Sequence, residues 1–296
     1  MNILITGAWQ QAKEHIEEIK QMGHEVIFLQ QEQDDLPCDP ETIEGVICNG
    51  LFLYHPIEQF TNLKYIQLTS AGTDRINTDY IKEHNITLHN ARGVYSAPMA
   101  EYAIAGVLSI YKNLNQFRNQ QKNHQWQKIR SQRELAGKNI LIIGCGSVGT
   151  ECARRFKAFG CRITGIDVQP QENQEFDIIY PITELDNLIP AADILILTVP
   201  LTKETTKLIN KDRLNKLKED AILINIARGK IIDQKALEEW NGTAILDVFE
   251  EEPLSEDSPL WDKEDWIITP HNSFIGEENG QRLSKLILSN LEDICL

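Results

Sequence analysis

Short apolar runs alternate with amphipathic or polar segments along the whole chain. In the first third, runs of strand length occupy residues 2–6, 25–29, 45–48, 65–68 and 87–89, with helical stretches near 11–21 and 76–84. Further along, such runs lie near 139–143, 162–166, 193–199, 221–226, 243–247 and 266–268, with helical stretches at 151–160, 185–191 and 212–219. Strands that alternate with helices form parallel sheets covered on both faces. The pattern therefore predicts an α/β fold with two doubly wound parallel-sheet domains.

A long helix is predicted where the two series meet. It runs from Pro98 to about Lys122, with Ser96 as its N-cap. Residues 99–108 are apolar on all sides and are expected to be buried, whereas residues 112–122 are strongly polar and are expected to reach past the domain. A subunit interface is one use for such a helix. An ordinary packed helix with a solvated tail is the alternative.

A glycine-rich loop follows the apolar run at 140–143 and precedes a helical segment. It reads Gly144-Cys145-Gly146-Ser147-Val148-Gly149. The first glycine permits a tight bend, the second lets the main chain approach a phosphate, and the third lets the helix pack closely on the strand. Asp167 ends the next strand, about 20 residues further on, where a carboxylate accepts hydrogen bonds from the adenosine ribose of NAD and disfavours NADP. The loop predicts dinucleotide binding, and an ordinary turn with a solvated Asp167 is the alternative.

Composition narrows the classes of partner. With 296 residues, of which 42% are hydrophobic, the chain can bury a large core. Its formal charge of -15 makes nucleic acid and anionic membranes unfavourable partners. The six cysteines are scattered without metal-ligand spacing, so we expect reduced thiols and no metal site. No signal peptide opens the sequence and no apolar stretch has membrane length, which favours a cytoplasmic protein.

Three ionisable residues, Arg228, Glu252 and His271, each come shortly after a strand of the second series. Open α/β sheets bind their ligands at the carboxyl ends of strands. A guanidinium matches a carboxylate with two parallel hydrogen bonds, and we expect Arg228 to be buried. Alone, each residue also has an ordinary interpretation: an ion-pair arginine, a solvated loop glutamate and a strand-end histidine. Their shared position in the module with the glycine loop favours a hydride-transfer site.

Seven ordered sequence blocks resemble the D-isomer-specific 2-hydroxyacid dehydrogenase family over nearly the whole chain. They are residues 70–74, 90–96 with 100–101, 144–149 with 167, 198–202, 226–229 with 232–233, 246–249 with 252–253, and 269–271. The resemblance implies a flavodoxin-like substrate domain at 1–96, completed by 276–296, and a Rossmann NAD-binding domain at 97–275. It also implies a homodimer formed through the region around the long helix.

The resemblance assigns catalytic roles. Arg228 would clamp the carboxylate of a 2-oxo acid and polarise its ketone. His271 would donate the proton that becomes the hydroxyl hydrogen while NADH delivers hydride to the carbon, and Glu252 would stabilise the imidazolium. The implied substrate contacts are Ala71, Gly72, Phe52, Tyr95, Arg228 and His271, with the main-chain N–H groups of the first two holding the carboxylate.

The resemblance also assigns cofactor contacts. The glycine loop would meet the pyrophosphate, the Thr198 segment would border the adenosine, and Asp247 with the carbonyl of Ile226 would fix the nicotinamide carboxamide. The implied NAD contacts are Gly144, Gly146, Ser147, Val148, Gly149, Asp167, Thr198, Val199, Pro200, Ile226, Ala227, Arg228, Asp247 and Ser96.

Two segments depart from the family pattern. The stretch between Arg228 and Glu252 is several residues shorter than in typical members, which truncates its helix and is expected to shift Glu252 slightly. Residues 272–276, after His271, are bulkier than the small residues common there, which leaves the width of the pocket open.

The side-chain pocket is assigned by the same resemblance to the loop after the strand at 45–48. In this chain the loop contains Leu51, Phe52 and Leu53 but no arginine or lysine. A phosphate there would lack a partner, so an uncharged substrate is favoured over 3-phosphoglycerate. Packing of the apolar side chains between the domains is the alternative. Arg75 and Arg92 are unplaced, and either could reverse the charge argument.

The sequence therefore predicts an NAD-dependent D-2-hydroxyacid dehydrogenase that reduces a small 2-oxo acid. One alternative is an NAD enzyme acting on another small carboxylate, such as formate. The other is a non-catalytic, NADH-sensing interaction protein, since relatives of this fold serve as corepressors. The intact set of Arg228, Glu252 and His271 disfavours the second alternative.

Overall fold

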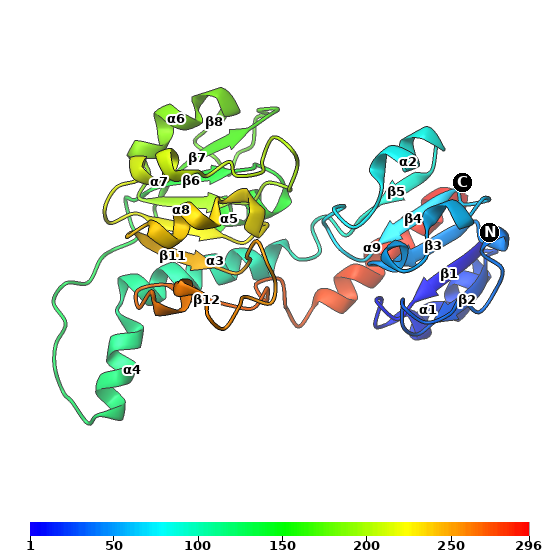
Figure 1. Ribbon diagram of the computed structural model, residues 1–296, viewed down its shortest axis with the longest axis horizontal. Helices are drawn as coiled ribbons and strands as arrows, with labels where there is room; N and C mark the ends of the chain where they lie inside the picture. The colour runs from blue at the N-terminus through cyan, green and yellow to red at the C-terminus, as the bar shows by residue number, and fades with distance from the viewer. Residues whose placement is uncertain (296) are drawn as a thin grey trace. The chain divides into compact units, whose positions relative to one another are not determined.

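The computed structural model describes residues 1–295, which form two compact units (Figure 1). Unit 1 contains residues 1–95 and the C-terminal segment from Gly276, and unit 2 contains Ser96–Ile275. The sequence predicts boundaries at 96/97 and 275/276, so the first of them lies one residue later than in the structure. Each unit has its own sheet and its own apolar cores.

Unit 1 is built on a five-stranded parallel sheet with the strand order β2-β1-β3-β4-β5. Its strands are β1 (Asn2–Thr6), β2 (Glu25–Leu29), β3 (Gly45–Cys48), β4 (Tyr65–Leu68) and β5 (Thr87–His89). In the register of the sheet, Leu4 pairs with Ile27 on one side and with Val46 on the other. This is the order of flavodoxin-like sheets, in which the direction of winding reverses between the first and third strands.

Helices cover both faces of the unit 1 sheet. They are α1 (Ala12–Gln21), α2 (Thr78–Glu83) and α9 (Asn279–Cys295). Helices α1 and α9 share a core with Ile3 and Ile5 on one face, and α2 shares a core with Leu4 on the other. The C-terminal helix belongs to this unit because the indole N–H of Trp9 donates to Ser284 Oγ at 2.9 Å.

Unit 2 is built on a seven-stranded parallel sheet with the order β12-β11-β10-β9-β6-β7-β8. Its strands are β6 (Asn139–Ile143), β7 (Arg162–Asp167), β8 (Ile178–Pro181), β9 (Ile194–Leu197), β10 (Ile222–Asn225), β11 (Thr243–Leu246) and β12 (Ile267–Ile268). Counted from β6, this is the doubly wound order of dinucleotide-binding sheets with one added edge strand. The predicted fold class, α/β with two doubly wound parallel sheets, is confirmed.

Helices also cover both faces of the unit 2 sheet. They are α3 (Ser96–Tyr111), α4 (Leu114–Lys122), α5 (Ser147–Ala158), α6 (Leu185–Leu188), α7 (Lys211–Lys216) and α8 (Gln234–Glu239). One core packs α3 and α5 against the sheet, and the other packs α6, α7 and α8 against the opposite face. None of the helices described, in either unit, is both long and apolar enough to span a bilayer.

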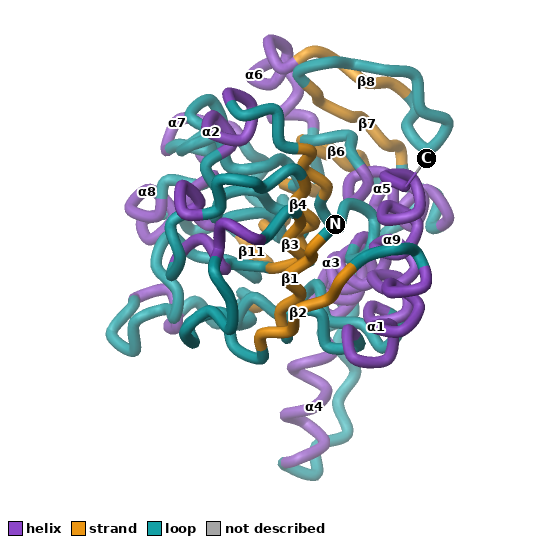
Figure 2. Tube along the Cα trace, turned by 90° about the vertical axis from the view of Figure 1, so that its right-hand side faces the viewer, coloured by secondary structure: helices purple, strands orange, loops and turns teal. Residues whose placement is uncertain are grey.

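The helix predicted over residues 98–122 is two helices, so this prediction was wrong. Asn113 adopts a left-handed conformation with φ of 52° between α3 and α4, which asparagine tolerates better than most residues. The chain returns to this point, where Arg133 N–H donates to Tyr111 O at 3.1 Å and the Arg133 guanidinium lies 4.2 Å from the Tyr111 ring centroid. These contacts fix the end of α3, and residues 112–133, here called the arm, project from the rest of unit 2 in both views (Figures 1 and 2).

Three smaller predictions also need correction. Ser96 is the first residue of α3 rather than its N-cap. The helix expected at 212–219 ends at Lys216 because Leu217 turns to an extended conformation. Strand β8 was not predicted, since it is a short edge strand that follows polar sequence and pairs only with β7.

Candidate active site

The glycine loop links β6 to α5 through two positions that require glycine. Gly144 has φ of 99°, and a Cβ there would lie 2.9 Å from main-chain atoms of Thr198 and Val199. A Cβ on Gly149 would lie 2.0 Å from the carbonyl oxygen of Gly144. The loop is therefore closely packed against the end of β9, and side chains at these two positions would force the main chain apart.

The first turn of α5 is open to an anion. Gly146 is its N-cap, with no side chain to accept from the helix amides, and Ser147 and Val148 are the first helical residues. Such amides, at the positive end of a helix, bind phosphate groups. The two backbone constraints and this uncapped turn fit the pyrophosphate of a dinucleotide.

Asp167, the residue predicted to bind the adenosine ribose, lies at the end of β7 beside the glycine loop. Its Oδ2 accepts from Cys145 N–H at 2.8 Å and its Oδ1 accepts from Gln169 N–H at 3.0 Å, so the carboxylate is tied to the glycine loop. Burial, with the neighbouring Asp167 charge, raises the pKa of the Cys145 thiol to about 12. The thiol in the loop therefore stays neutral, and it adds no negative charge beside a phosphate.

The Thr198 segment borders the same loop. The hydroxyl of Thr198 donates to Gly144 O at 2.7 Å and to Ile143 O at 3.1 Å, where β6 passes into the glycine loop. Val199 and Pro200 continue from this residue beside the loop and are partly buried and exposed, respectively. The predicted cofactor contacts from β6, β7 and β9 thus lie together at the carboxyl ends of these neighbouring strands.

A third group of predicted cofactor residues lies at the end of β10. Ile226 and Ala227 are buried, and Asn225 shapes the turn because its side chain accepts from Ala227 N–H and donates to Arg228 O. Arg228 is half-buried rather than buried as predicted, and one guanidinium nitrogen donates to Ala227 O at 2.8 Å. Ser96 is buried, and its hydroxyl has no hydrogen-bond partner among residues 1–295.

Glu252 and His271 form a hydrogen-bonded pair. Glu252 Oε2 lies 2.8 Å from His271 Nδ1, and Glu252 Oε1 accepts from Phe249 N–H at 3.0 Å. The two side chains remain 37% and 34% exposed, so the pair is accessible from solvent. In the shortened segment before Glu252 the α-helix, α8, has six residues, and the pair forms nonetheless. Among the bulky residues after the histidine, Phe274 meets the imidazole edge to face at 5.9 Å.

Asp247 holds the turn that carries the histidine, here called the histidine turn (residues 269–273). Its main-chain oxygen accepts from His271 N–H at 2.8 Å. Its buried carboxylate accepts from Thr269 Oγ1 at 2.6 Å, from Asn272 N–H at 2.7 Å and from Ser273 N–H at 2.9 Å. These bonds sustain a φ of 51° at His271, an uncommon conformation for a residue other than glycine. The predicted contact of Asp247 with nicotinamide stays a prediction.

Tyr102 extends this network and was missed in the sequence. Its hydroxyl lies 2.7 Å from Thr269 Oγ1, and since that oxygen donates to Asp247, Tyr102 is the donor. Burial raises the pKa of Tyr102, so the phenol keeps its proton. A helical residue 167 positions before Thr269 offers no pattern that predicts such a contact.

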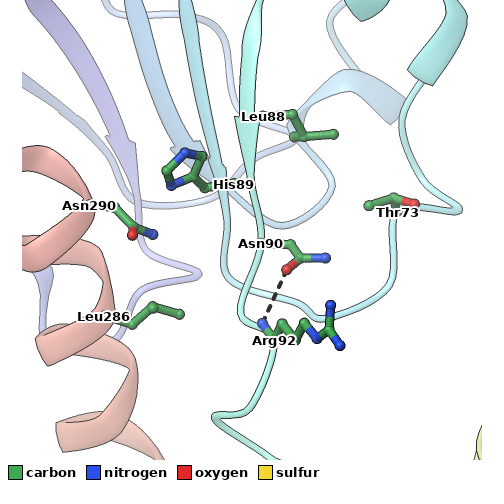
Figure 3. A pocket seen from close by; sticks show the side chains of 7 residues that line it. All are labelled: Thr73, Leu88, His89, Asn90, Arg92, Leu286 and Asn290. Atoms are coloured by element: carbon green, nitrogen blue, oxygen red, sulfur yellow. Dashed lines mark hydrogen bonds between the residues drawn. The ribbon is translucent and has the colours of Figure 1, made fainter. Parts of the chain in front are cut away.

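The predicted substrate residues of unit 1 lie in two groups: the segment of Ala71 and Gly72, which Tyr95 contacts, and a second segment that contains Phe52. Tyr95 donates its hydroxyl hydrogen to Thr69 O, just before Ala71 and Gly72. Asn90 Nδ2 donates to Ala71 O at 2.8 Å, which braces the same segment. Beside it is a hollow of about 320 Å³ (Figure 3). The hollow is lined by Thr73, Leu88, His89, Asn90, Arg92, Leu286 and Asn290.

The second segment, residues 49–55, is here called the pocket loop. Phe52 is half-buried and packs edge to face on Phe60 with centroids 5.6 Å apart. Leu53 and Tyr54 are 61% and 55% exposed, so they are the apolar side chains of the loop that remain accessible. Arg75, unplaced by the sequence, has its side chain beside Gly50, which brings a cation next to the loop.

Comparison with known proteins places the chain in a family. Residues 104–273, more than half of the chain, match the family described as D-isomer specific 2-hydroxyacid dehydrogenase, NAD binding domain. A glyoxylate reductase of Thermofilum pendens is 34% identical over 243 residues, which are 78% of this chain and 71% of the relative. A D-3-phosphoglycerate dehydrogenase of Methanocaldococcus jannaschii is 34% identical over 245 residues, which are 80% of this chain and 47% of the relative.

Solved structures agree with the sequence matches. The crystal structure of a D-isomer specific 2-hydroxyacid dehydrogenase family protein from Aeromonas salmonicida matches with a TM-score of 0.81 at 27% identity, covering 99% of this chain and 96% of that one. The same fold thus accompanies the sequence identity. The chain belongs to the D-isomer specific 2-hydroxyacid dehydrogenase family and is an NAD-dependent enzyme that acts on the CH–OH group of 2-hydroxy acids.

Proposed function

We propose that this enzyme reduces small, unphosphorylated 2-oxo acids to D-2-hydroxy acids, with His271 as the general acid. The pair of His271 Nδ1 and Glu252 Oε2 at 2.8 Å carries the proposal. A carboxylate on one ring nitrogen orients the imidazole, stabilises its charged form and leaves Nε2 to exchange a proton with a ligand. General acid catalysis of this kind contributes about 10² to 10⁴ in rate.

The other site residues bind and orient in this proposal. Arg228 holds the substrate carboxylate, and its half-exposed guanidinium suits that role. The glycine loop and the first turn of α5 hold the pyrophosphate, and Asp167 accepts from the adenosine ribose. Bound NADH supplies the hydride. His271 gives a proton to the developing alkoxide from Nε2 and takes it back in the reverse direction.

The substrate class is proposed from the pocket loop. The relatives leave it open, since one is a glyoxylate reductase and another a D-3-phosphoglycerate dehydrogenase. Exposed Leu53 and Tyr54 favour an apolar or short side chain, and an added methylene gains about 0.8 kcal/mol when buried. The loop itself has no cation for a phosphate, although Arg75 lies beside it.

A substrate panel tests the proposal. We expect NADH-dependent reduction of glyoxylate, hydroxypyruvate, pyruvate or longer 2-oxo acids to exceed that of phosphohydroxypyruvate by at least about tenfold in kcat/KM, which corresponds to about 1.4 kcal/mol. Formate oxidation serves as the control for a different carboxylate. Efficient turnover of phosphohydroxypyruvate alone would overturn the substrate class and direct attention to Arg75 and Arg92.

The role of the glutamate is tested by Glu252→Gln. The carboxylate lies 2.8 Å from His271 Nδ1 and orients the imidazole, whereas an amide can present either a donor or an acceptor to that nitrogen and orients the ring less strictly. We therefore expect kcat for ketone reduction to fall by about tenfold or more in the variant, with KM for NADH unchanged. The measurement is steady-state kinetics of wild type and variant with the same 2-oxo acid. Equal kcat values would show that Glu252 is not coupled to His271.

A homodimer is our proposal for the assembly, with the arm as the contact. The arm has six lysines and arginines and no acidic residue in a chain of formal charge -15. Trp126 in the arm is fully exposed and Leu114 is half-exposed, which suits burial in an interface. Sedimentation should report a dimer that Trp126→Ser weakens, whereas a monomer at all concentrations would refute it.

We also infer a cytoplasmic location. The five cysteines whose side chains the structure describes are free thiols, which is the usual state in a reducing compartment. Fractionation of cells that produce the protein would test this inference.

A further inference from the structure

One acidic side chain of unit 1 lies where sheets of this order bind ligands. The winding reverses between β1 and β3, and the crevice at such a switch point is the usual ligand site. Glu32 follows β2 and reaches this point, where its carboxylate meets the ends of both β1 and β3. The carboxylate of Glu32 therefore occupies the position at which a bound anionic ligand is expected in such a sheet.

The carboxylate of Glu32 accepts three hydrogen bonds there. Oε1 accepts from Asn49 N–H at 2.6 Å and from Thr6 Oγ1 at 2.8 Å, and Oε2 accepts from Gly50 N–H at 2.7 Å. Thr6 is the last residue of β1 and is fully buried. Bonds from two successive amides to one carboxylate are short and charge-assisted, and each is stronger than a neutral hydrogen bond.

The same segment also holds the far end of the pocket loop. His55 Nε2 lies 3.1 Å from Glu32 O and 3.1 Å from Asp34 O, so the ring N–H is shared between two carbonyl groups. Residues 32–34 thus hold the pocket loop at its first two residues and at its last. A loop held at both ends loses little further entropy when a ligand packs against it.

The part of the loop between these bonds presents accessible apolar groups. Leu51 is fully buried and anchors the middle, whereas Leu53 and Tyr54 remain more than half exposed. Tyr54 and Glu32 also line a hollow of about 200 Å³ with Gly7, Ala8 and Gln30. The position of these two exposed side chains depends on where Glu32 holds the main chain of Asn49 and Gly50.

We propose that Glu32 is a positioning residue that sets substrate specificity, by holding the pocket loop so that Leu53 and Tyr54 face the substrate side chain. This rests on the proposed function, because the loop must contact a 2-oxo acid. Glu32 itself touches no substrate. Its carboxylate replaces an external anion at the switch point, and its removal leaves two amides and a hydroxyl able to receive one.

The test compares Glu32→Ala and Glu32→Gln with wild type. Asp35→Ala is the matched control, because Asp35 is exposed, lies three residues after Glu32 and carries the same charge. In Glu32→Ala, hydrogen exchange at the Asn49 and Gly50 amides should rise by about tenfold or more. The ratio of kcat/KM for the best bulky 2-oxo acid to that for glyoxylate should fall by about tenfold, with KM for NADH unchanged. Asp35→Ala should change neither quantity.

Chemical rescue separates a role of the carboxylate from a general loss of structure. Acetate should occupy the vacated place in Glu32→Ala, slow the exchange of both amides and restore part of the specificity ratio, whereas neutral acetamide should do neither. Wild type measured with acetate controls for competition with substrate. If Glu32→Ala does not fold, Glu32→Gln keeps the volume and one acceptor oxygen, and should show the same changes at smaller size.

Each outcome has a distinct meaning. An unchanged specificity ratio in an active Glu32→Ala enzyme would overturn this assignment and leave the proposed function intact, even if the two amides exchanged faster. A wild-type enzyme that reduced no 2-oxo acid would overturn the proposed function, and this assignment with it.

Discussion

Two turns of unit 2 prepare for ligands in opposite ways. In the glycine loop, Gly144 and Gly149 allow a tight path, and the amides at the start of α5 have no side-chain acceptor. In the histidine turn, the amides of His271, Asn272 and Ser273 are all taken by Asp247. The first turn offers its main chain to a ligand, whereas the second uses its main chain only to aim one imidazole.

This difference predicts which changes harm binding and which harm chemistry. A change in the glycine loop should weaken cofactor binding, because the main chain of the loop is the group proposed to bind the pyrophosphate. A change to the imidazole should leave cofactor binding intact, because no side chain of the histidine turn supports the glycine loop in the structure described. The following variants probe this separation.

The largest effect is expected for His271→Ala. It removes the proposed proton donor without touching the glycine loop, so kcat should fall by about 100-fold or more while affinity for NADH changes little. Steady-state kinetics and fluorescence titration with NADH measure the two quantities. A parallel loss of NADH affinity would break the proposed separation of the two turns.

Gly149→Ala tests the opposite side. Its Cβ would lie 2.0 Å from Gly144 O, so the loop must open before the side chain fits. We expect affinity for NADH to fall by about tenfold or more, with a lower Tm. As a control, Gly137→Ala changes a surface glycine whose added Cβ meets nothing within 4 Å, although its φ of 77° adds local strain. Equal NADH affinity in Gly149→Ala and wild type would contradict the role of close packing.

Asp167→Ala sharpens the description of the cofactor. The carboxylate repels a 2′-phosphate, so wild type should prefer NADH to NADPH by at least about tenfold, or about 1.4 kcal/mol. The variant should narrow this gap while kcat with NADH changes less. Comparable kcat/KM values for the two cofactors in wild type would refute the assignment.

Tyr102→Phe should give the smallest effect. The variant loses only the hydrogen bond to Thr269 and leaves the bonds of Asp247 to the turn in place. A net loss of about 1 kcal/mol would lower kcat by roughly fivefold, with KM for NADH unchanged and a pH profile of the same shape. A loss as large as that of His271→Ala would show that the histidine turn depends on α3 far more than its own bonds indicate.

The features predicted correctly were those that depend on local sequence. The strands of unit 1 and the glycine loop follow from apolar runs and from glycines that tolerate few replacements, so their existence was visible in local sequence. The break at Asn113 depends on Arg133 returning to Tyr111, and β8 depends on the neighbouring β7. Neither contact leaves a local pattern, and both were missed.

The site shows the same limit. Their positions after strands placed Glu252 and His271 in one predicted site, and the family resemblance implied that they pair. The structure brings the two side chains to 2.8 Å. Tyr102 and Glu32 were not predicted, because each acts through a bond to a segment distant in sequence. The burial predicted for Arg228 was also wrong, since its side chain is only partly buried.

The route of the chain through the two units has a consequence for biosynthesis. Trp9 is buried against Ser284, 275 positions later, and the face of the unit 1 sheet under α9 is apolar. A ribosome releases all of unit 2 between these two segments, so unit 2 can fold while unit 1 still exposes that face. The N-terminal strands therefore remain uncovered by α9, and prone to aggregation, until the last helix leaves the exit tunnel.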